Sequence, residues 1–223
     1  METSRKALVT GGNRGIGHAI AELLRSRGHE VRTPTREELD LVSPTSVQAY
    51  LQGSTWQPDI LVNNAGLNKI NPLETLPLDD WQTILNTNLT APFLLTQAVA
   101  GPMKARGWGR ILNISSCYSL VSRVGRMAYT ASKSGLNGLT QSSAVELAPY
   151  NILVNAICPG FVETDMTRQN NNPAQIEALR AQVPLGRLAK PEEIAEFVAF
   201  LVSDRNTYLT GQCIPIDGGF LSQ

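Results

Sequence analysis

Cysteine, histidine and net charge are all scarce in this sequence of 223 residues. It holds three cysteines and two histidines, and its 19 basic side chains balance its 19 acidic ones. An odd number of cysteines without metal-ligand spacing argues against structural disulfides, so we expect no metal site and a reducing, cytoplasmic environment. A balanced charge gives no basic surface for nucleic acid or anionic lipid, and we expect neither nucleic acid nor membrane as a partner.

Long hydrophobic runs are also absent. The longest, such as AEFVAFLV at 195–202, fall far short of the roughly 20 residues that span a membrane. The chain enters an apolar stretch at residues 6–10 almost directly, which leaves no room for a signal peptide. No repeat or linker divides the sequence, and a chain of this length can bury a sizeable core. We therefore expect residues 1–223 to form a single domain.

Short apolar runs alternate with longer segments of helical periodicity. The runs expected to form strands are 6–10, 30–33, 59–66, 109–116 and 151–160. The segments expected to form helices are 15–28, 43–52, 77–105 and 128–148. Apolar strands that alternate with helices predict a parallel sheet covered on both faces. The expected fold is therefore α/β, a Rossmann-like doubly wound parallel sheet of six to seven strands.

One connection is too short for this pattern. Only about five residues separate the strand expected at 30–33 from the apolar segment LDLV at 39–42, whereas a parallel crossover needs a dozen or more. Either the helix between the second and third strands is missing, or the third strand is vestigial. We expect a shortened crossover and a loop-like edge on that side of the sheet.

A glycine-rich turn, TGGNRGIG at 10–17, joins the first expected strand to the first expected helix. Its glycines allow a sharp turn and a close approach of backbone to ligand, and the helix N-terminus offers free N–H groups to a pyrophosphate. No Lys-Ser/Thr pair follows the last glycine, which disfavours a phosphate-loop nucleoside triphosphatase. The residues expected to contact a dinucleotide here are Gly11, Asn13, Arg14, Gly15, Ile16 and Gly17.

The end of the second strand bears on which dinucleotide is bound. An acidic residue there typically binds the ribose 2′-OH of NAD. Here the stretch reads VRTPTREE, with Arg36 near the expected position and Arg14 in the glycine turn. Two arginines favour the 2′-phosphate of NADP through charge-assisted hydrogen bonds. The alternative is that Arg36 belongs to a solvated turn and pairs with Glu37 or Glu38.

Tyr129 and Lys133, in YTASK at 129–133, stand one helical turn apart and so share a helix face. A free tyrosine has a pKa of about 10, which is too high for acid-base work near neutrality. A neighbouring ammonium group favours the phenolate, so we expect the pKa of Tyr129 to be lowered toward the working range. The spacing alone is a common chance pairing and needs support from the rest of the chain.

That support comes from a resemblance to the short-chain dehydrogenase/reductase family, in its compact single-domain branch. The motifs that carry it are TGGNRGIG, NNAG (63–66), NTNL (86–89), ISS (114–116), YTASK, PG (159–160) and IDGG (216–219). The resemblance covers nearly the whole chain, and the ending from LGRLAKPEEIA to DGG is similar to the 3-oxoacyl-reductase-like group. The short crossover departs from the family pattern and looks more like the compact turn of nucleotide-sugar reductases.

The resemblance implies four catalytic residues. Tyr129 would donate a proton to the carbonyl oxygen as hydride reaches the carbon, and Lys133 would hydrogen-bond the nicotinamide ribose. Ser116 would orient the substrate carbonyl. Asn88 would anchor a water chain to the lysine for proton relay.

Two of these roles have a competing residue nearby in the sequence. Ser115 could replace Ser116, although the thirteen-residue spacing to the tyrosine favours Ser116. Asn86 could replace Asn88, although the Asn-Leu pairing favours Asn88.

The additional positions that the resemblance places at the cofactor are Asp40 at the adenine amine, Asn63, Ala65 and Gly66 near the adenosine and ribose, and Pro159, Gly160, Val162 and Thr164 at the nicotinamide carboxamide.

The same resemblance bears on substrate and assembly. Residues 165–190 stand where the family carries a substrate lid. The polar start of that segment, together with Arg123 and Arg126, admits a polar or anionic substrate; alternatively, these arginines are solvated or lie at a subunit interface. The helices expected at 77–105 and 128–148 resemble the family's dimer interface, which with a second contact near the C-terminus implies a homotetramer.

The implied function is reduction of a small-molecule carbonyl compound, a ketone or 3-oxoacyl substrate, to a secondary alcohol with NADPH. One alternative is oxidation of a sugar, polyol or alcohol with NAD, which would require an acid near Thr35. Another is a dinucleotide-binding regulator without turnover. The complete set of four catalytic residues argues against the regulator.

Overall fold

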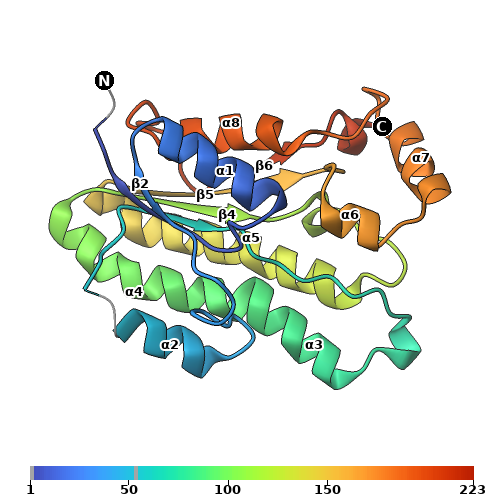
Figure 1. The fold of residues 1–223 in the computed structure, drawn as a ribbon, viewed down its shortest axis with the longest axis horizontal. Coiled ribbons are helices and arrows are strands. Elements are labelled where there is room, and N and C mark those ends of the chain that lie inside the picture. Colours follow the sequence, from blue (N-terminus) through green and yellow to red (C-terminus); the bar gives the residue numbers. More distant parts are fainter. Residues whose placement is uncertain (1–2, 53–54) are drawn as a thin grey trace.

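The computed structural model describes residues 3–52 and 55–223, and a six-stranded parallel sheet lies at its centre (Figure 1). The strands are β1 (Lys6–Val9), β2 (Glu30–Arg32), β3 (Ile60–Asn63), β4 (Gly109–Ile114), β5 (Ile152–Pro159) and β6 (Cys213–Ile216). Their order is β2-β1-β3-β4-β5-β6, and every neighbouring pair is parallel. The winding therefore reverses between β1 and β3, which confirms the doubly wound class predicted from the sequence.

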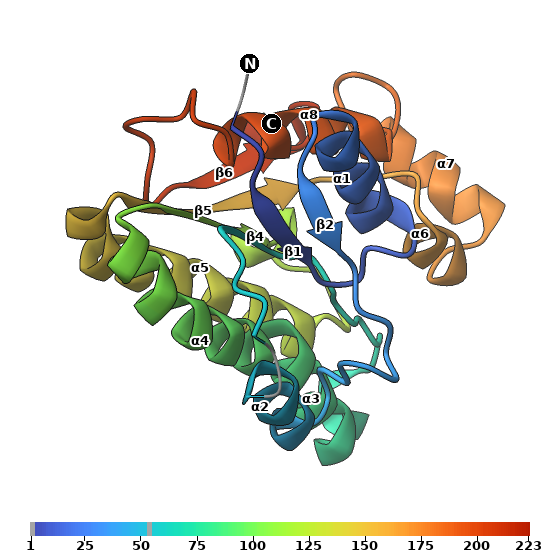
Figure 2. The same ribbon diagram turned by 60° about the vertical axis from the view of Figure 1, so that its left-hand side comes forward.

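Helices cover both faces of this sheet (Figures 1 and 2). The helices are α1 (Gly15–Ser26), α2 (Pro44–Gln52), α3 (Leu78–Leu85), α4 (Ala91–Arg106), α5 (Met127–Leu147), α6 (Asp165–Gln169), α7 (Pro173–Ala181) and α8 (Pro191–Leu201). One face carries α1 and α8, and the other carries α2, α4 and α5. No helix within the described parts of the chain is long and apolar enough to cross a membrane.

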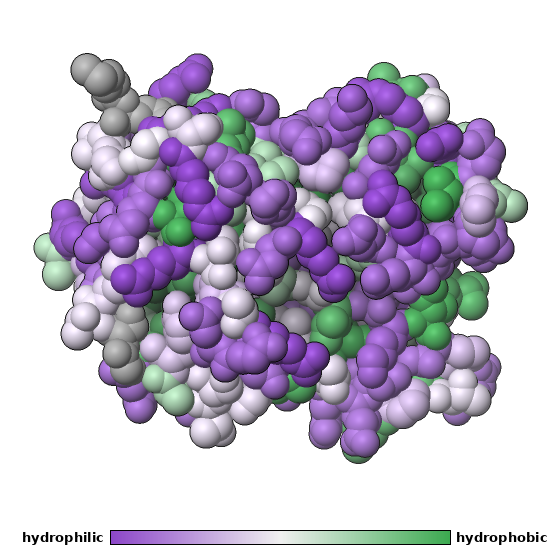
Figure 3. All heavy atoms as spheres, viewed as in Figure 1, coloured by the Kyte–Doolittle hydropathy of each residue, from purple (hydrophilic) through white to green (hydrophobic). Residues whose placement is uncertain are grey.

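The core is divided into two layers by the alternation of side chains along the strands. In β3, Ile60 and Val62 pack toward α1 and α8, whereas Leu61 packs toward α4 and α5. Every residue of β3, β4 and β5 is buried, as their continuous apolar runs predict. The face of the molecule seen in Figure 3 is mostly polar, with hydrophobic side chains in scattered groups.

The edge beside β2 is loop-like, as expected, and of the two alternatives the vestigial strand is the one that holds. Residues 39–42 lie in an irregular segment with turns rather than in a strand, and the chain then enters α2 and crosses to β3. The Ser43 hydroxyl accepts a hydrogen bond from the Ser46 N–H at 3.2 Å, so it caps the start of α2. As a result β2, only three residues long, forms the edge of the sheet.

The long helical segment expected at 77–105 is not one continuous α-helix. α3 ends at Leu85, residues Asn86–Thr90 form a single π-helical turn, and α4 begins at Ala91. A π turn holds one more residue per hydrogen-bonded loop than an α turn and often lies at a functional site. Here it carries Asn88, whose side chain is fully buried.

Candidate active site

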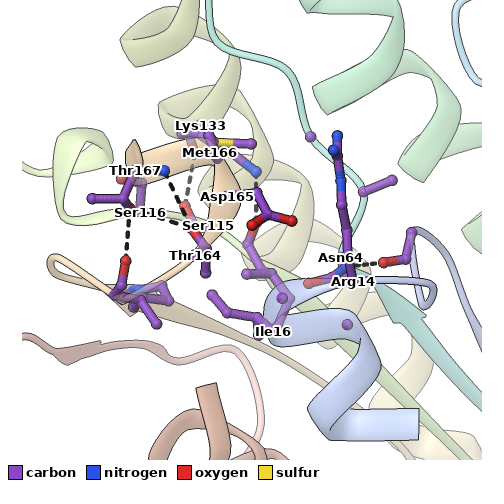
Figure 4. A pocket seen from close by; sticks show the side chains of 18 of the residues that line it. Arg14, Ile16, Asn64, Ser115, Ser116, Lys133, Thr164, Asp165, Met166 and Thr167 are labelled. Atoms are coloured by element: carbon purple, nitrogen blue, oxygen red, sulfur yellow. Dashed lines mark hydrogen bonds between the residues drawn. The ribbon is translucent and has the colours of Figure 1, made fainter. Parts of the chain in front are cut away.

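The carboxyl ends of the central strands open onto one cleft. Two cavities, of about 290 Å³ and about 250 Å³, share Gly11, Arg14, Ala65 and Gly66 and are therefore continuous. Figure 4 shows the first of them. The cleft lies where the winding reverses between β1 and β3, the position at which open α/β sheets bind ligands.

Nearly all the residues predicted from the sequence to contact a cofactor line this cleft. They are Gly11, Asn13, Arg14, Gly15, Ile16, Gly17, Arg36, Asp40, Ala65, Gly66, Tyr129, Lys133, Pro159, Gly160, Val162 and Thr164. Asn63 does not line it, because its side chain is buried in the sheet and donates to Asn113 Oδ1 at 2.8 Å. The neighbouring Asn64 lines the cleft instead.

The glycine turn is held in a shape that suits a pyrophosphate. Thr10 Oγ1 accepts from the N–H groups of Asn64 and Ala65 at 3.0 Å and 3.1 Å, and Asn64 Nδ2 donates to the Thr10 carbonyl at 2.9 Å. Gly11 has a φ of +63°, which favours glycine. A Cβ on Gly17 would collide with Gly11 O and Asn64 Nδ2. The glycines thus leave space at the N-terminus of α1 that side chains would otherwise fill. Backbone N–H groups at a helix N-terminus bind phosphate, so these residues fit the pyrophosphate of a dinucleotide.

The second cavity forms the end of the cleft beside β2. Its lining includes Asn13, Arg14, Thr35, Arg36 and Asp40. The Arg36 guanidinium pairs with Asp40, with Nε and Oδ1 3.6 Å apart, and its side chain is 77% exposed. The expected alternative partners, Glu37 and Glu38, do not pair with it within the described residues. Arg36 thus lies at this end of the cleft, and Arg14 lies where the two cavities meet.

Ser116, Tyr129 and Lys133 meet at the opposite end. Ser116 follows β4, and the other two project from one face of α5. Lys133 Nζ is buried and donates to the Ile114 carbonyl at 2.6 Å. The Ser115 hydroxyl donates to the Lys133 carbonyl at 3.3 Å, so Ser115 is engaged with the α5 backbone. Ser116 Oγ accepts from the Tyr118 N–H at 3.1 Å and so keeps its own proton for another partner, which favours Ser116 as the serine that can donate to a substrate.

Burial shifts the pKa values of Tyr129 and Lys133, and for Tyr129 the shift is opposite to the one expected from the sequence. Burial raises the pKa of Tyr129 to about 12, opposed by a hydrogen bond with Ser116 and by the charge of Arg126. Burial also lowers the pKa of Lys133 to about 8. The expectation of a lowered tyrosine pKa was therefore wrong for this structure, because the loss of solvation outweighs the neighbouring charges.

Asn88 lies behind Lys133 rather than in the cleft. Its Oδ1 accepts from the Leu67 N–H at 2.8 Å, and its Nδ2 donates to the Leu67 carbonyl at 2.9 Å and to Ser132 Oγ at 3.0 Å. A Cβ built on Gly66 would lie 3.5 Å from both Asn88 Oδ1 and Lys133 Nζ, so the two side chains flank one spot. Asn86 is turned elsewhere and donates to the Val42 carbonyl at 3.1 Å.

Sequence reasoning missed several residues at the site. Asp165, Met166 and Thr167 of α6 line the first cavity, and Thr164 caps this helix by accepting from the Thr167 N–H at 3.3 Å. A threonine followed by an acidic residue, a few residues after a strand, is a helix-start signal that could have located this helix. Among the described residues, no group of three or more His, Cys, Asp or Glu side chains could hold a metal ion.

Comparison with known proteins agrees with this geometry. Residues 33–221 match a family model described as enoyl-(acyl carrier protein) reductase. The chain is 42% identical to 3-oxoacyl-(acyl-carrier-protein) reductase FabG of Vibrio cholerae, over 96% of each chain. It is 37% identical to acetoacetyl-CoA reductase of Shinella zoogloeoides, over 97% of this chain and 98% of that one. A crystal structure of gluconate 5-dehydrogenase from Burkholderia cenocepacia, in complex with NADP and tartrate, superposes with a TM-score of 0.89 at 30% identity, over 100% of this chain and 97% of that one.

The fold, the cleft and these relatives define an oxidoreductase built on a dinucleotide-binding sheet. The chain belongs to the short-chain dehydrogenase/reductase family.

Proposed function

We propose that the protein reduces a ketone or 3-oxoacyl substrate to a secondary alcohol with NADPH. The observation that carries this proposal is the single cleft, which has Ser116, Tyr129 and Lys133 at one end, Arg36 at the other and Arg14 where its two cavities meet. The names of two relatives, a 3-oxoacyl reductase and an acetoacetyl-CoA reductase, support the same reaction class.

In the proposed reaction, Ser116 holds the carbonyl oxygen beside Tyr129, and Tyr129 gives its phenolic proton to that oxygen. NADPH, when bound, supplies the hydride that reaches the carbonyl carbon. The carbon thus gains a hydride and the oxygen gains a proton, which yields the alcohol. A proton then returns to Tyr129 through Lys133 and a water chain anchored by Asn88. Residues 1–223 act as one catalytic domain in this proposal.

The protonation of the site favours the reductive direction. With its pKa raised to about 12, Tyr129 keeps its proton at neutral pH, which is the form that reduction of a carbonyl requires, although the raised pKa makes it a weaker acid. Oxidation of an alcohol would need the phenolate, which burial disfavours. The sugar or polyol oxidation with NAD, also considered from the sequence, ranks lower because it would require an acid near Thr35.

The pH dependence of reduction should report Lys133. Its pKa of about 8 lies below that of Tyr129, so both groups carry their protons below pH 8 and the lysine loses its charge above it. We expect kcat/KM for reduction to be level below about pH 8 and to fall above it, because this ratio follows the free enzyme. The measurement is the rate of NADPH oxidation with ethyl acetoacetate across this range. Lys133→Arg, which stays charged throughout, should abolish the fall; a fall that persists in this variant would assign it to another group.

The cofactor preference should depend on Arg36. The solved relative from Burkholderia cenocepacia contains NADP, which supports NADP for this chain. Arg36→Asp should raise the Kd for NADPH by about tenfold, because a charge-assisted hydrogen bond is lost and a like charge is introduced. The Kd for NADH should change much less. Titration of cofactor fluorescence measures both constants, with Arg205→Asp as an exposed control away from the cleft.

An unchanged preference in Arg36→Asp would contradict this assignment and place the 2′-phosphate at Arg14 alone. Tighter binding of NADH than NADPH by the unaltered protein would overturn the NADPH proposal itself.

The proposal includes a lid and an assembly. Residues 165–190 would form the lid over the substrate end, which is supported by the three α6 residues that line the cleft. We also propose a homotetramer, with α4 and α5 at one of its contacts because they expose apolar side chains such as Phe93 and Val145. A cytoplasmic location is proposed because none of the three cysteines forms a disulfide.

A further inference from the structure

A third cavity of about 100 Å³ adjoins the reactive end of the cleft. This third cavity shares Ser116 and Tyr129 with the first cavity. A substrate whose carbonyl lies at Ser116 can therefore extend another of its groups into the third cavity. Its other polar lining residues are Asn68, Arg123, Arg126, Thr167, Asn170 and Asn171. Neither arginine in this cavity forms an ion pair with a carboxylate in the described chain.

Arg126 is the unusual member of this set, because it is only 9% exposed. Within residues 3–52 and 55–223 its guanidinium has no hydrogen bond or salt bridge, and the Tyr118 ring lies 5.6 Å from it. The nitrogens of Arg126 are not among the fully buried polar atoms that lack a partner, so the guanidinium faces the cavity. A charge in so confined a place is poorly solvated, and an aromatic ring at this distance offsets only a small part of that cost. Arg123, three residues earlier, is exposed, so its charge is solvated.

The backbone around Arg126 adds to the positive charge. Arg126 is the N-cap residue of α5, a helix of 21 residues, and its side chain makes no capping hydrogen bond. A helix N-terminus carries partial positive charge and normally favours an acidic or short polar side chain, so a cation is unfavourable there. Neither the helix nor the core explains an arginine at this position. Both features would become favourable with an anion in the cavity.

We propose that Arg126 binds an anionic group of the substrate, so that the protein acts on a small oxo acid rather than on a neutral ketone. This rests on the proposed function, since it assigns the substrate class of the same site. The planar guanidinium suits a carboxylate, which accepts two parallel hydrogen bonds from it. The carbonyl of the oxo acid lies at Ser116 and Tyr129, and its carboxylate extends into the third cavity. Arg126 is thus a specificity-determining residue rather than a catalytic one.

The test compares oxo acids with their primary amides, which have the same shape and no charge. Pyruvate, acetoacetate and levulinate, each beside its amide, place the charge at three distances from the ketone. Each compound is assayed for NADPH oxidation and, separately, for calorimetric binding to the protein with NADP⁺. For at least one length the acid should bind more tightly, and be reduced with a higher kcat/KM, by about 10- to 100-fold.

The variants assign that preference to one side chain. Arg126→Met should remove the ratio of acid to amide, and Arg126→Lys should keep part of it. The ratio is the informative quantity, because loss of the Arg126 charge also acts on Tyr129 and would slow acid and amide alike. Arg123→Met is the matched control and should change the ratio less. Thermal unfolding of each variant establishes that it is folded.

Each outcome separates this inference from the proposed function. The role of Arg126 would be overturned if acids and amides bound alike at all three lengths, or if no acid bound at all. It would also be overturned if the ratio of acid to amide were unaltered in Arg126→Met. Reduction of amides without acid preference would overturn it while leaving the reductase intact. Preferential, Arg126-dependent binding of an acid without NADPH oxidation would leave the anion site standing and overturn the reductase.

Discussion

Tyr129→Phe should abolish most turnover while the Kd for NADPH changes by no more than a few-fold. The substitution removes only the phenolic hydroxyl, so the packing of the ring in α5 is preserved. Without a positioned acid, the oxygen of the carbonyl would take its proton from water, and kcat should fall by about 10²- to 10⁴-fold. Steady-state reduction of ethyl acetoacetate, together with a fluorescence titration of the cofactor, gives both quantities.

Tyr208→Phe is the matched control for this experiment, because Tyr208 is 96% exposed and lines neither cavity of the cleft. It should keep full activity. If Tyr129→Phe retained more than a tenth of the turnover of the unaltered protein, another group would have to be the acid.

The second large effect is expected for Gly17→Ala. The added methyl group would collide with the Gly11 carbonyl and with Asn64 Nδ2, the atom that ties β3 to the glycine turn. Relieving this overlap must move the turn away from α1, so the N–H groups that face the cleft are displaced. We expect the Kd for NADPH to rise by about 10- to 100-fold and the free energy of unfolding to fall by about 1–3 kcal/mol, the usual cost of overpacking.

Gly101→Ala provides the matched control. Gly101 lies in α4 with nothing within 4 Å of its added Cβ, so alanine there should be neutral or stabilising by up to about 1 kcal/mol. Chemical denaturation and cofactor titration of the two variants measure the contrast. Near-normal NADPH binding by Gly17→Ala would show that the turn does not need its close approach to α1.

Much of the architecture was predictable because the central strands are buried along their whole length. A strand such as β5, apolar at nearly every position, has few other ways to bury its side chains. The glycine turn was predictable for a related reason: a strand, glycines and a helix in that order leave the backbone few alternatives. The motifs of the family then placed Ser116, Tyr129 and Lys133, and the structure brings them to one cavity.

Other features depend on tertiary contacts that have no local signature. β6 was not predicted, because its four residues include Pro215 and are only half-buried or exposed at the edge of the sheet. The helices α6 and α7 lie in a polar segment in which only the interpretation as a lid was made. The direction of the pKa shift at Tyr129 depends on how deeply the ring is buried, which spacing along a helix cannot reveal.

The π-helical turn at Asn86–Thr90 also limits how this chain can change in length. Deleting one residue from this turn would let the hydrogen bonds close into a continuous α-helix, so the fold could absorb the loss. A π turn takes up its extra residue within about one turn, so α3 and α4 would nearly keep their relative facing and only the residues inside the turn would shift. Asn88 would then leave Leu67 and Ser132. Insertions and deletions compatible with activity are therefore expected outside residues 86–90, even though this segment can repair its backbone after losing a residue.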